Sequence, residues 1–280
     1  MRVLVTGSTG LVGEAYIARL RTRGDAPVRL VRGKTPFPED TIAWDPDRGK
    51  IDARSLEGLD AVVHLAGENI AVGRWTPERK KRIRDSRVRG TQLLCEALAG
   101  RSSPPPVLVS ASAIGYYGNR GDEALDEDAP PAEDFLAEVC QEWEAATAPA
   151  AAAGIRVVRL RIGMVLSGDG GALARMVTPF RLGLGGVVGT GRQYMSWIAL
   201  EDLASAIEHC IGCESLAGAV NATAPNPAAN REFTKALGRV LRRPTLFPMP
   251  AAAVRLLFGE MGEALLLGGA RILPKRLLDT

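Results

Sequence analysis

The chain opens with Met1-Arg-Val-Leu-Val-Thr-Gly-Ser-Thr-Gly-Leu-Val-Gly13, and this stretch decides the fold. The apolar run at residues 3–5 predicts a buried parallel strand, which stops at Gly7. Gly10 and Gly13 follow at three-residue spacing, and the amphipathic segment 11–23 can begin a helix there. A strand, a glycine turn and a helix in that order are the context that a dinucleotide-binding fingerprint requires.

Each glycine of this turn has its own predicted task. Gly7 allows the tight turn, Gly10 lets the backbone approach a pyrophosphate, and Gly13 lets the helix pack close to the strand. The helix N-terminus then offers free N–H groups and a partial positive charge to the phosphates. The alternative is a turn that binds nothing. We predict a nucleotide site made of Gly7, Ser8, Thr9, Gly10, Leu11, Val12 and Gly13.

The bulk composition is that of a soluble globular protein. The 280 residues suit one large or two intimately joined domains, with 46% apolar and 24% charged residues. The net charge of +3 (35 Lys and Arg against 32 Asp and Glu) is too small to demand a polyanionic partner. No apolar run approaches the ~18 residues of a membrane span, and Met1 leads straight into a strand without a signal peptide. We therefore expect a cytoplasmic protein with no membrane contact.

The cysteines are too few for a disulfide scaffold, so reduced thiols are expected. Cys210 and Cys213 have the spacing of a redox or zinc pair, but the chain has no second pair. The two cysteines lie at the end of a helical segment at 200–211, which favours a role in packing over metal binding or redox chemistry. We expect no metal site.

Strand-like and helix-like segments alternate along the first half of the chain. The strand candidates are Val3–Thr6, Val28–Arg32, Ala61–Ala66, Val107–Ser112 and Ile155–Val165. The helical segments between them are Leu11–Arg23, Thr76–Ala99 and Asp134–Ala153, the last interrupted near its end by Pro149. This alternation predicts an α/β fold, a doubly wound parallel sheet of Rossmann type, with the ligand crevice at the carboxyl ends of the strands.

The composition changes after about residue 163, where glycine-rich and proline-punctuated stretches begin. We predict a nucleotide-binding domain over residues 1–165, its sheet completed by later segments near 195–225. Residues 166–280 would form a smaller, interleaved substrate-facing lobe.

The end of the second strand bears on the choice of nucleotide. NAD enzymes place a carboxylate there for the ribose 2′-hydroxyl, whereas NADP enzymes commonly use arginine for the 2′-phosphate. This chain has Arg32 and Lys34 there and no carboxylate. Arg32 can bind a phosphate bidentately, so we predict NADP. The alternative is that both are solvated loop charges.

Two further clusters of polar residues stand out. The cationic stretch 79–89 could bind nucleic acid, but it lacks interleaved aromatic residues, so a solvated helix face is the better interpretation. Arg192, Gln193 and Trp197 suit recognition of an anionic or hydroxylated small molecule. Packing between the lobes would explain them equally well.

Motifs along the whole chain resemble one family. They are Thr6-Gly-Ser-Thr-Gly-Leu-Val-Gly13, His64-Leu-Ala-Gly-Glu-Asn-Ile70, Ser86-Arg-Val-Arg-Gly-Thr91, Ser110-Ala-Ser-Ala-Ile-Gly-Tyr-Tyr-Gly118, Gly191-Arg-Gln-Tyr-Met-Ser-Trp-Ile198 and Leu273-Pro-Lys-Arg-Leu277. The chain resembles an atypical extended short-chain dehydrogenase/reductase of the epimerase-like group, the NAD-dependent epimerase/dehydratase family, with its small C-terminal domain. The resemblance implies a Rossmann-type fold and NADP binding. It also implies that the chain stops slightly short of the family's usual end.

The resemblance implies further site residues and shows departures from the family pattern. It adds to the cofactor site Leu65, Ala66, Gly67, Glu68, Arg87 and Ser110. The family's proton-transfer pair, a tyrosine and a lysine four residues apart, is missing. Leu136 and Cys140 occupy those positions when Glu144 is taken as the acid that follows them, and Arg87 occupies the asparagine position.

Of the usual catalytic set only Ser112 is retained, with Tyr116 and Tyr117 expected at the cleft rim as tentative acids. These features predict an NADP-dependent oxidoreductase acting on an unidentified small molecule, as a monomer or homodimer. Hydride would pass to or from C4 of the nicotinamide, with Ser112 holding the substrate oxygen. One alternative is a non-catalytic NADP-binding protein that senses redox state or regulates a partner. A nucleotide-sugar epimerase-like enzyme is a weaker alternative, because it needs the missing base.

Overall fold

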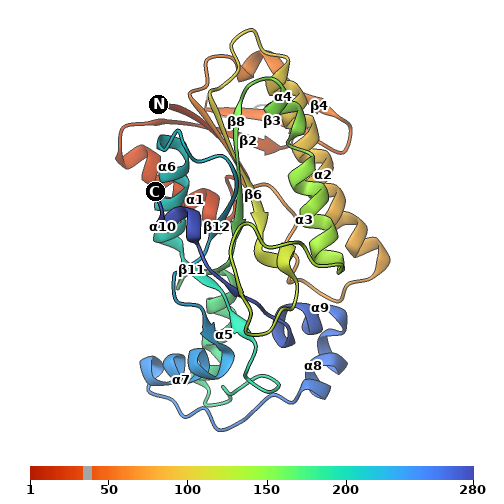
Figure 1. Cartoon of the computed structure of the whole chain (residues 1–280), viewed down its shortest axis with the longest axis vertical. Coiled ribbons are helices and arrows are strands. Elements are labelled where there is room, and N and C mark those ends of the chain that lie inside the picture. The colour runs from red at the N-terminus through yellow and green to blue at the C-terminus, as the bar shows by residue number, and fades with distance from the viewer. Residues whose placement is uncertain (34–39) are drawn as a thin grey trace.

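The computed structural model describes residues 1–33 and 40–280 of the chain. Its centre is an eight-stranded sheet in the order β12-β8-β6-β5-β1-β2-β3-β4, which is parallel except for the antiparallel pair β3–β4 (Figure 1). The strands of this sheet are β1 (Arg2–Thr6), β2 (Ala26–Arg32), β3 (Thr41–Asp45), β4 (Lys50–Ile51), β5 (Ala61–His64), β6 (Val107–Ala113), β8 (Arg156–Ile162) and β12 (Gly218–Ala222). The predicted doubly wound α/β fold is therefore confirmed.

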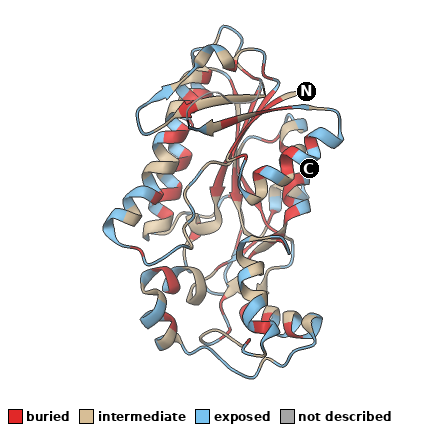
Figure 2. Ribbon diagram, turned by 180° about the vertical axis from the view of Figure 1, so that it is seen from behind, coloured by how far each residue is buried: buried red, intermediate tan, exposed pale blue. Residues whose placement is uncertain are grey.

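Helices cover both faces of the sheet, so its strands are buried on two sides (Figure 2). On one face α1 (Leu11–Thr22) packs beside α6 (Leu200–Gly212). On the other, α2 (Pro77–Ala99) packs against α3 (Phe135–Ala145) and α4 (Ala148–Ala152). Along β6, Val107 and Val109 join one core and Leu108 joins the other. Alternation of apolar side chains between two cores explains the continuous apolar runs of these strands.

A smaller lobe lies at the carboxyl ends of the strands (Figure 1). Its helical elements are α5 (Gly171–Arg181), α7 (Asn230–Leu241), α8 (Ala251–Phe258), α9 (Glu260–Gly262) and the π-helical turn η3 (Glu263–Leu267). Short strand pairs support them: β9 (Met164–Leu166) with β11 (Trp197–Ala199), β10 (Tyr194–Met195) with β13 (Ala228–Ala229), and β7 (Ala124–Leu125) with β14 (Arg271–Ile272). The last helix, α10 (Lys275–Leu278), returns to lie against β12.

Two predicted segments are divided in the structure. The strand predicted at 155–165 is two strands, β8 and β9, interrupted at Gly163. A side chain at Gly163 would come within 2.7 Å of the Ser196 carbonyl oxygen, so the chain changes sheets at a residue without one. The helix predicted at 134–153 ends at Ala145, and α4 begins at Ala148 with Pro149 in its first turn. Proline is tolerated in a first turn, where its missing N–H costs nothing.

Strands β3 and β4 and the 3₁₀ turns η1 (Ala53–Leu56) and η2 (Ile114–Tyr117) were not predicted. In β3 only Trp44 is buried, so the strand lacks the apolar run that marks β1 or β5.

Candidate functional site

The glycine turn between β1 and α1 lies in the middle of the sheet, where the connections reverse direction. In the strand order, β5 stands on one side of β1 and β2 on the other. Ligands of doubly wound sheets bind at such a switch point, beyond the carboxyl ends of the strands. The carboxyl ends of β1, β2, β5 and β6, where the crevice is predicted, face the smaller lobe (Figure 1).

The glycines of this turn are sterically required. Gly7 has φ +63°, and a side chain there would lie 2.7 Å from the Leu65 carbonyl carbon. A side chain at Gly13 would overlap the carbonyl oxygen of Gly7. The Gly10 N–H donates to that same oxygen over 3.0 Å and closes the turn. The backbone thus reaches a compactness that only glycine permits at Gly7 and Gly13.

A buried hydrogen-bond chain fixes this turn to the end of β5. The Thr6 hydroxyl accepts from the N–H groups of Leu65 and Ala66, each over 3.0 Å, and lies 2.7 Å from Nδ1 of His64. Because the Thr6 hydroxyl already accepts two hydrogen bonds, its single proton is donated to Nδ1 of His64. The proton of the neutral ring is therefore on Nε2. Nε2 donates to the Thr91 hydroxyl over 2.8 Å. Burial lowers the pKa of His64 to about 4, so the ring is neutral.

The N-terminus of α1 has no side-chain cap. Gly10 stands at the N-cap, and the Ser8 hydroxyl is buried without a hydrogen-bond partner among the described residues. Thr9 is exposed and Leu11 and Val12 are half-buried beside it. Uncapped helix N–H groups with a buried free hydroxyl are suited to bind an anion. This arrangement fits a dinucleotide's pyrophosphate.

Arg32 is exposed at the carboxyl end of β2 and makes no ion pair with a described residue. Lys34, predicted as a second cation, lies outside the described residues. A different arginine of the same strand, Arg29, donates to the Ser8 carbonyl oxygen over 3.1 Å. The edge of the crevice therefore carries positive charge on β2, and sequence analysis missed the part that Arg29 plays in holding the turn.

Arg87 of α2 lies against the segment that follows β5. Its guanidinium would be 3.2 Å from a side chain at Gly67, it stacks 5.0 Å from the ring centre of Trp143, and it donates to the Ile83 carbonyl oxygen over 3.1 Å. No described carboxylate forms an ion pair with it, and burial lowers its pKa. Arg87 is therefore a cation with free donors at the crevice. Glu68, which the family resemblance adds to the cofactor site, pairs with Arg79 and Arg82.

The positions that resemblance assigns to proton transfer hold no acid or base. Leu136 and Cys140 face η2, where a side chain at Gly115 would contact both of them. Burial, and next the Glu144 carboxylate, raise the pKa of the Cys140 thiol to about 12. The thiol therefore stays protonated and uncharged, and it cannot replace an ammonium group.

Ser112 is buried at the end of β6 and belongs to a network that the sequence did not reveal. Its hydroxyl donates to Oε1 of Glu144 over 2.8 Å, and Ser110 is buried one pleat earlier. Arg161 donates to both oxygens of the same carboxylate, over 2.8 and 3.0 Å, and both partners are at most 6% exposed. Burial opposes the charge of Arg161, but the bonds to Glu144 outweigh it and raise the pKa of Arg161.

The two tyrosines have different environments, and the expected position of Tyr117 at the cleft rim is wrong. Tyr117 is fully buried, donates to Oδ1 of Asn221 and accepts from Arg161, each over 2.8 Å. Burial raises the pKa of Tyr117. Tyr116 is half-buried, and the Arg161 guanidinium stacks 3.5 Å from the centre of its ring. Of the two, Tyr116 is the one whose side chain reaches solvent.

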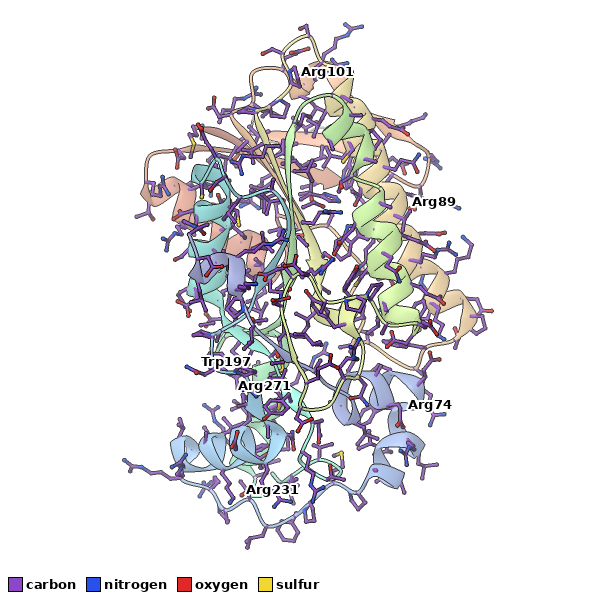
Figure 3. All side chains as sticks on the ribbon, viewed as in Figure 1. Arg74, Arg89, Arg101, Trp197, Arg231 and Arg271 are labelled. Atoms are coloured by element: carbon purple, nitrogen blue, oxygen red, sulfur yellow. The ribbon has the colours of Figure 1, made fainter. Side chains whose placement is uncertain are left out.

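The candidate substrate residues at 192–197 lie in different environments. Arg192 is exposed, whereas Gln193 is buried and its amide donates to the carbonyl oxygens of Val188 and Leu266 over 3.0 and 2.8 Å. Trp197 is half-buried on β11, at the junction of the two lobes (Figure 3). The contacts of Gln193 favour packing for that residue, which was one of the two alternatives.

The cationic face of α2 is neutralised by ion pairs. Lys81 and Arg89 pair with Asp85, Arg84 pairs with Glu142, and Lys80 pairs with Glu260. Cys210 is buried in the core beneath α6. Within residues 1–33 and 40–280 no group of three His, Cys, Asp or Glu stands close enough to hold a metal ion, and no helix is long and apolar enough to cross a membrane.

A parallel sheet with a glycine turn at its switch point defines a Rossmann-type nucleotide-binding protein. Residues 3–216 match the model of the NAD dependent epimerase/dehydratase family, and residues 249–280 match a domain of unknown function, DUF1731. The chain therefore belongs to the NAD dependent epimerase/dehydratase family.

Relatives cover nearly the whole chain. An epimerase family protein of Mycobacterium bovis is 45% identical over 275 residues, 98% of this chain and 90% of the relative. The human epimerase family protein SDR39U1 is 39% identical over 283 residues, 100% and 94% of the two chains. The crystal structure of human SDR39U1 with NADPH matches with a TM-score of 0.90 at 36% identity, over 100% of this chain and 93% of that one.

Proposed function

We propose that the protein is an NADPH-dependent oxidoreductase of the atypical short-chain type, acting on a small molecule. The observation that carries the proposal is the glycine turn, which leaves the N–H groups of α1 and the Ser8 hydroxyl free for an anion. The similarity to human SDR39U1, whose structure was determined with NADPH, supports the choice of coenzyme. In this proposal residues 1–165 bind the coenzyme and residues 166–280 face the substrate.

Different residues of the crevice would bind different parts of the coenzyme. The turn from Gly7 to Gly13 would hold the pyrophosphate, and the Arg32 guanidinium would hold the 2′-phosphate. Leu65, Ala66 and Gly67 would support the ribose side, where Arg87 adds a positive charge. Bound NADPH would supply a hydride to an electrophilic carbon of the substrate. Ser110 lies below this surface and shapes it by packing.

The proton that follows the hydride needs a different donor from the family's usual tyrosine. Leu136 has no exchangeable proton, and the Cys140 thiol is buried. The Tyr116 hydroxyl is the remaining candidate, because Tyr116 is half-buried whereas Tyr117 is fully buried. The guanidinium of Arg161 lies over the Tyr116 ring. We propose Tyr116 as the proton donor and Ser112 as the group that fixes the substrate oxygen, with Trp197 and Arg192 contacting the rest of the substrate.

One observation favours a non-catalytic, NADPH-sensing protein as a second candidate. The hydroxyls of Ser112 and Tyr117 are both committed to the buried Glu144–Arg161 pair and its neighbours. If they keep those bonds when ligands bind, neither hydroxyl is free for a substrate. An epimerase is less well supported, since transient oxidation of a sugar hydroxyl requires a base that Leu136 and Cys140 do not supply.

Coenzyme titration followed by turnover assays tests these alternatives. Calorimetry should show NADPH binding, with weaker binding of NADH. NADPH oxidation should then be measured against a panel of aldehydes, ketones and quinones for the wild type, Ser112→Ala and Tyr116→Phe. Turnover that falls about 100-fold or more in either variant supports the oxidoreductase. Tight NADPH binding without turnover on any compound would favour the sensor, and no binding of either coenzyme would refute both.

A further inference from the structure

The far end of the smaller lobe carries a groove lined by cations. A groove of about 670 Å³ is lined by four cations: Lys235 and Arg239 on α7, Arg242 at its C-cap and Arg243 just beyond it. We call these four residues the cationic groove. Arg231, at the first turn of the same helix, marks this end of the molecule at the foot of Figure 3. The groove lies in the smaller lobe, away from the glycine turn, and the proposed oxidoreductase activity does not use it.

The charges of the cationic groove have no acidic partner among the residues that the structure describes. None of its four residues forms an ion pair with a carboxylate of the described residues. Glu232 is the one acidic residue that lines it, and its carboxylate accepts from the N–H of Ala229 at the start of α7. This differs from the cations of α2, which have acidic partners on neighbouring elements. Uncompensated positive charge around a concavity favours an anionic ligand.

Backbone strain occurs at the same place. Arg242 ends α7 with φ 51°, and among the described residues it is the only one other than glycine with a positive φ. Glycine or asparagine would adopt this conformation with less strain. This conformation ends the helix, because the N–H groups of Arg242 and Arg243 donate to the carbonyl oxygens of Arg239 and Gly238 over 3.1 and 2.9 Å. A cationic side chain therefore stands where glycine is usual. Arg243 beside it donates to the Arg181 carbonyl oxygen over 3.0 Å, which fixes the groove to the end of α5.

Exposed apolar side chains border the cationic groove. They come from the loop after α5 and the loop after α7, which run together where a side chain at Gly186 would overlap the Phe247 backbone. We call the following residues the apolar rim: Leu182 (70% exposed), Leu184 (61%), Leu246 (73%) and Phe247 (60%). Large apolar side chains grouped at such exposure are typical of an interaction surface.

We propose that the cationic groove and the apolar rim together bind an acidic segment of a partner protein, one that alternates carboxylates with leucine or phenylalanine. Carboxylates would pair with the four cations, and the apolar side chains would cover the rim. Concavity favours a peptide over a flat membrane surface. Among the groove and rim residues Phe247 is the single aromatic ring on which a base could stack, which disfavours single-stranded nucleic acid, whose successive bases need several rings.

Fluorescence polarisation with a labelled 14-residue probe, alternating Glu or Asp with Leu or Phe, tests the proposal on the full-length protein. The wild type should bind it with a salt-dependent affinity, and the same peptide with Gln and Asn in place of its acids should not bind. Arg239→Glu/Arg243→Glu should weaken binding by about tenfold or more, and Leu246→Ser/Phe247→Ser by a smaller factor. The matched control is Lys50→Glu/Arg54→Glu, which reverses two exposed charges of the sheet domain and should leave binding unchanged.

Thermal unfolding of each variant establishes that it is folded. Equal peptide affinity of the wild type and Arg239→Glu/Arg243→Glu would overturn the proposal, as would failure of the wild type to bind the acidic peptide. Binding to phosphatidylserine vesicles without binding to the peptide would assign the surface to a membrane instead. Loss of self-association in Arg239→Glu/Arg243→Glu by sedimentation, with no peptide binding, would assign it to a second copy of the chain.

Discussion

The two ends of the candidate site are built from different parts of the polypeptide. At the glycine turn, the geometry depends on backbone: Gly7 and Gly13 leave no room for a side chain, and Thr6 binds two backbone N–H groups. Near α3, the geometry depends on side chains: Ser112, Glu144 and Arg161 form a closed network. Leu136 and Cys140 stand beside it, where the family resemblance places the proton-transfer pair.

This difference shows which part of a Rossmann site can change without loss of the fold. Anion binding by backbone N–H groups requires one chain conformation, so a single substitution at a glycine alters all of it. Proton transfer requires only that certain side chains be present, and these can be exchanged while the sheet and helices stay in place. The first end of the site is therefore expected to be intolerant of substitution, and the second to determine which reaction occurs.

The largest effect is expected from Gly13→Val. Its side chain would overlap the Gly7 carbonyl oxygen, so β1 and α1 must separate and the turn must open. We expect loss of NADPH binding by calorimetry. We also expect a destabilisation of about 3 kcal/mol in urea unfolding, the upper part of the usual range for overpacked cores, because the overlap is with backbone atoms. Gly24→Ala is the control: Gly24 has φ +79° and no atom within 4 Å, so it should cost about 1 kcal/mol. Retained NADPH binding in Gly13→Val would show that the turn is not the phosphate site.

Arg161→Met tests whether the second end is structurally as demanding as the first. It leaves the buried Glu144 carboxylate with only the more distant Arg159, at 4.0 Å, as a cationic partner, which should lower the free energy of unfolding by about 3 kcal/mol. The double variant Glu144→Leu/Arg161→Met removes both charges and should recover much of that loss. Urea denaturation of the wild type, both single variants and the double variant gives the coupling energy. Additive effects would mean that the pair does not act as a unit.

The dependence of stability on pH tests the Thr6–His64–Thr91 chain. The pKa of His64 is lowered from 6.5 to about 4 by burial. Below pH 6.5 His64 is protonated in the unfolded chain but stays neutral in the folded chain. The free energy of unfolding therefore falls as pH falls toward 4. Titration of His64 should lower the free energy of unfolding by about 3 kcal/mol in total. The decrease begins near pH 6.5 as the pH is lowered and is complete below pH 4.

Urea unfolding of His64→Gln at several pH values isolates that contribution, because the variant lacks the titrating group. The control is His209→Gln, at a half-buried histidine that contacts the Thr280 hydroxyl. It should keep the wild-type pH dependence. A wild type and a His64→Gln variant with parallel pH profiles would contradict a neutral, buried His64.

The smallest effect is expected from Arg32→Glu, because the side chain is exposed and only one contact is lost. A carboxylate at this position repels the 2′-phosphate and can accept a hydrogen bond from a ribose hydroxyl. NADPH affinity should fall about 10- to 100-fold, and NADH affinity should stay the same or rise slightly. Calorimetry with both coenzymes measures the ratio. An unchanged preference for NADPH would show that another residue binds the 2′-phosphate.

The sequence predicted the backbone-determined end of the site and missed most of the side-chain-determined end. Gly7, Gly10 and Gly13 are informative because they are close in sequence and their spacing has a steric reason. Tyr117 and Asn221 are 104 residues apart, and Glu144 and Arg161 lie on a helix and a strand whose pairing requires the folded sheet. Nothing local distinguished Tyr117 from Tyr116, so both were expected at the rim.

The same limitation explains the strands that were predicted only loosely or not at all. β12, Gly218-Ala-Val-Asn-Ala222, was expected only as part of the segments near 195–225 that complete the sheet, because it is too short and too poor in large apolar residues to stand out. It is recognisable as a strand only because β8 offers a parallel edge for it. The pair β3–β4 is likewise held by its neighbour, since Trp44 packs into the core beside α2.

The repeated passage of the chain between its two lobes has a consequence for motion. The polypeptide leaves the sheet domain after β6 for β7 and returns at α3, leaves after β8 and returns at α6, and leaves after β12 and returns at α10 (Figure 1). A hinge motion of two lobes requires a few residues at one hinge to absorb the whole rotation. Here every crossing segment would have to bend in concert, and Asn221 is also tethered to the Leu273 carbonyl oxygen over 3.0 Å. Ligands should therefore enter and leave by local movement of loops, while the lobes keep a fixed separation.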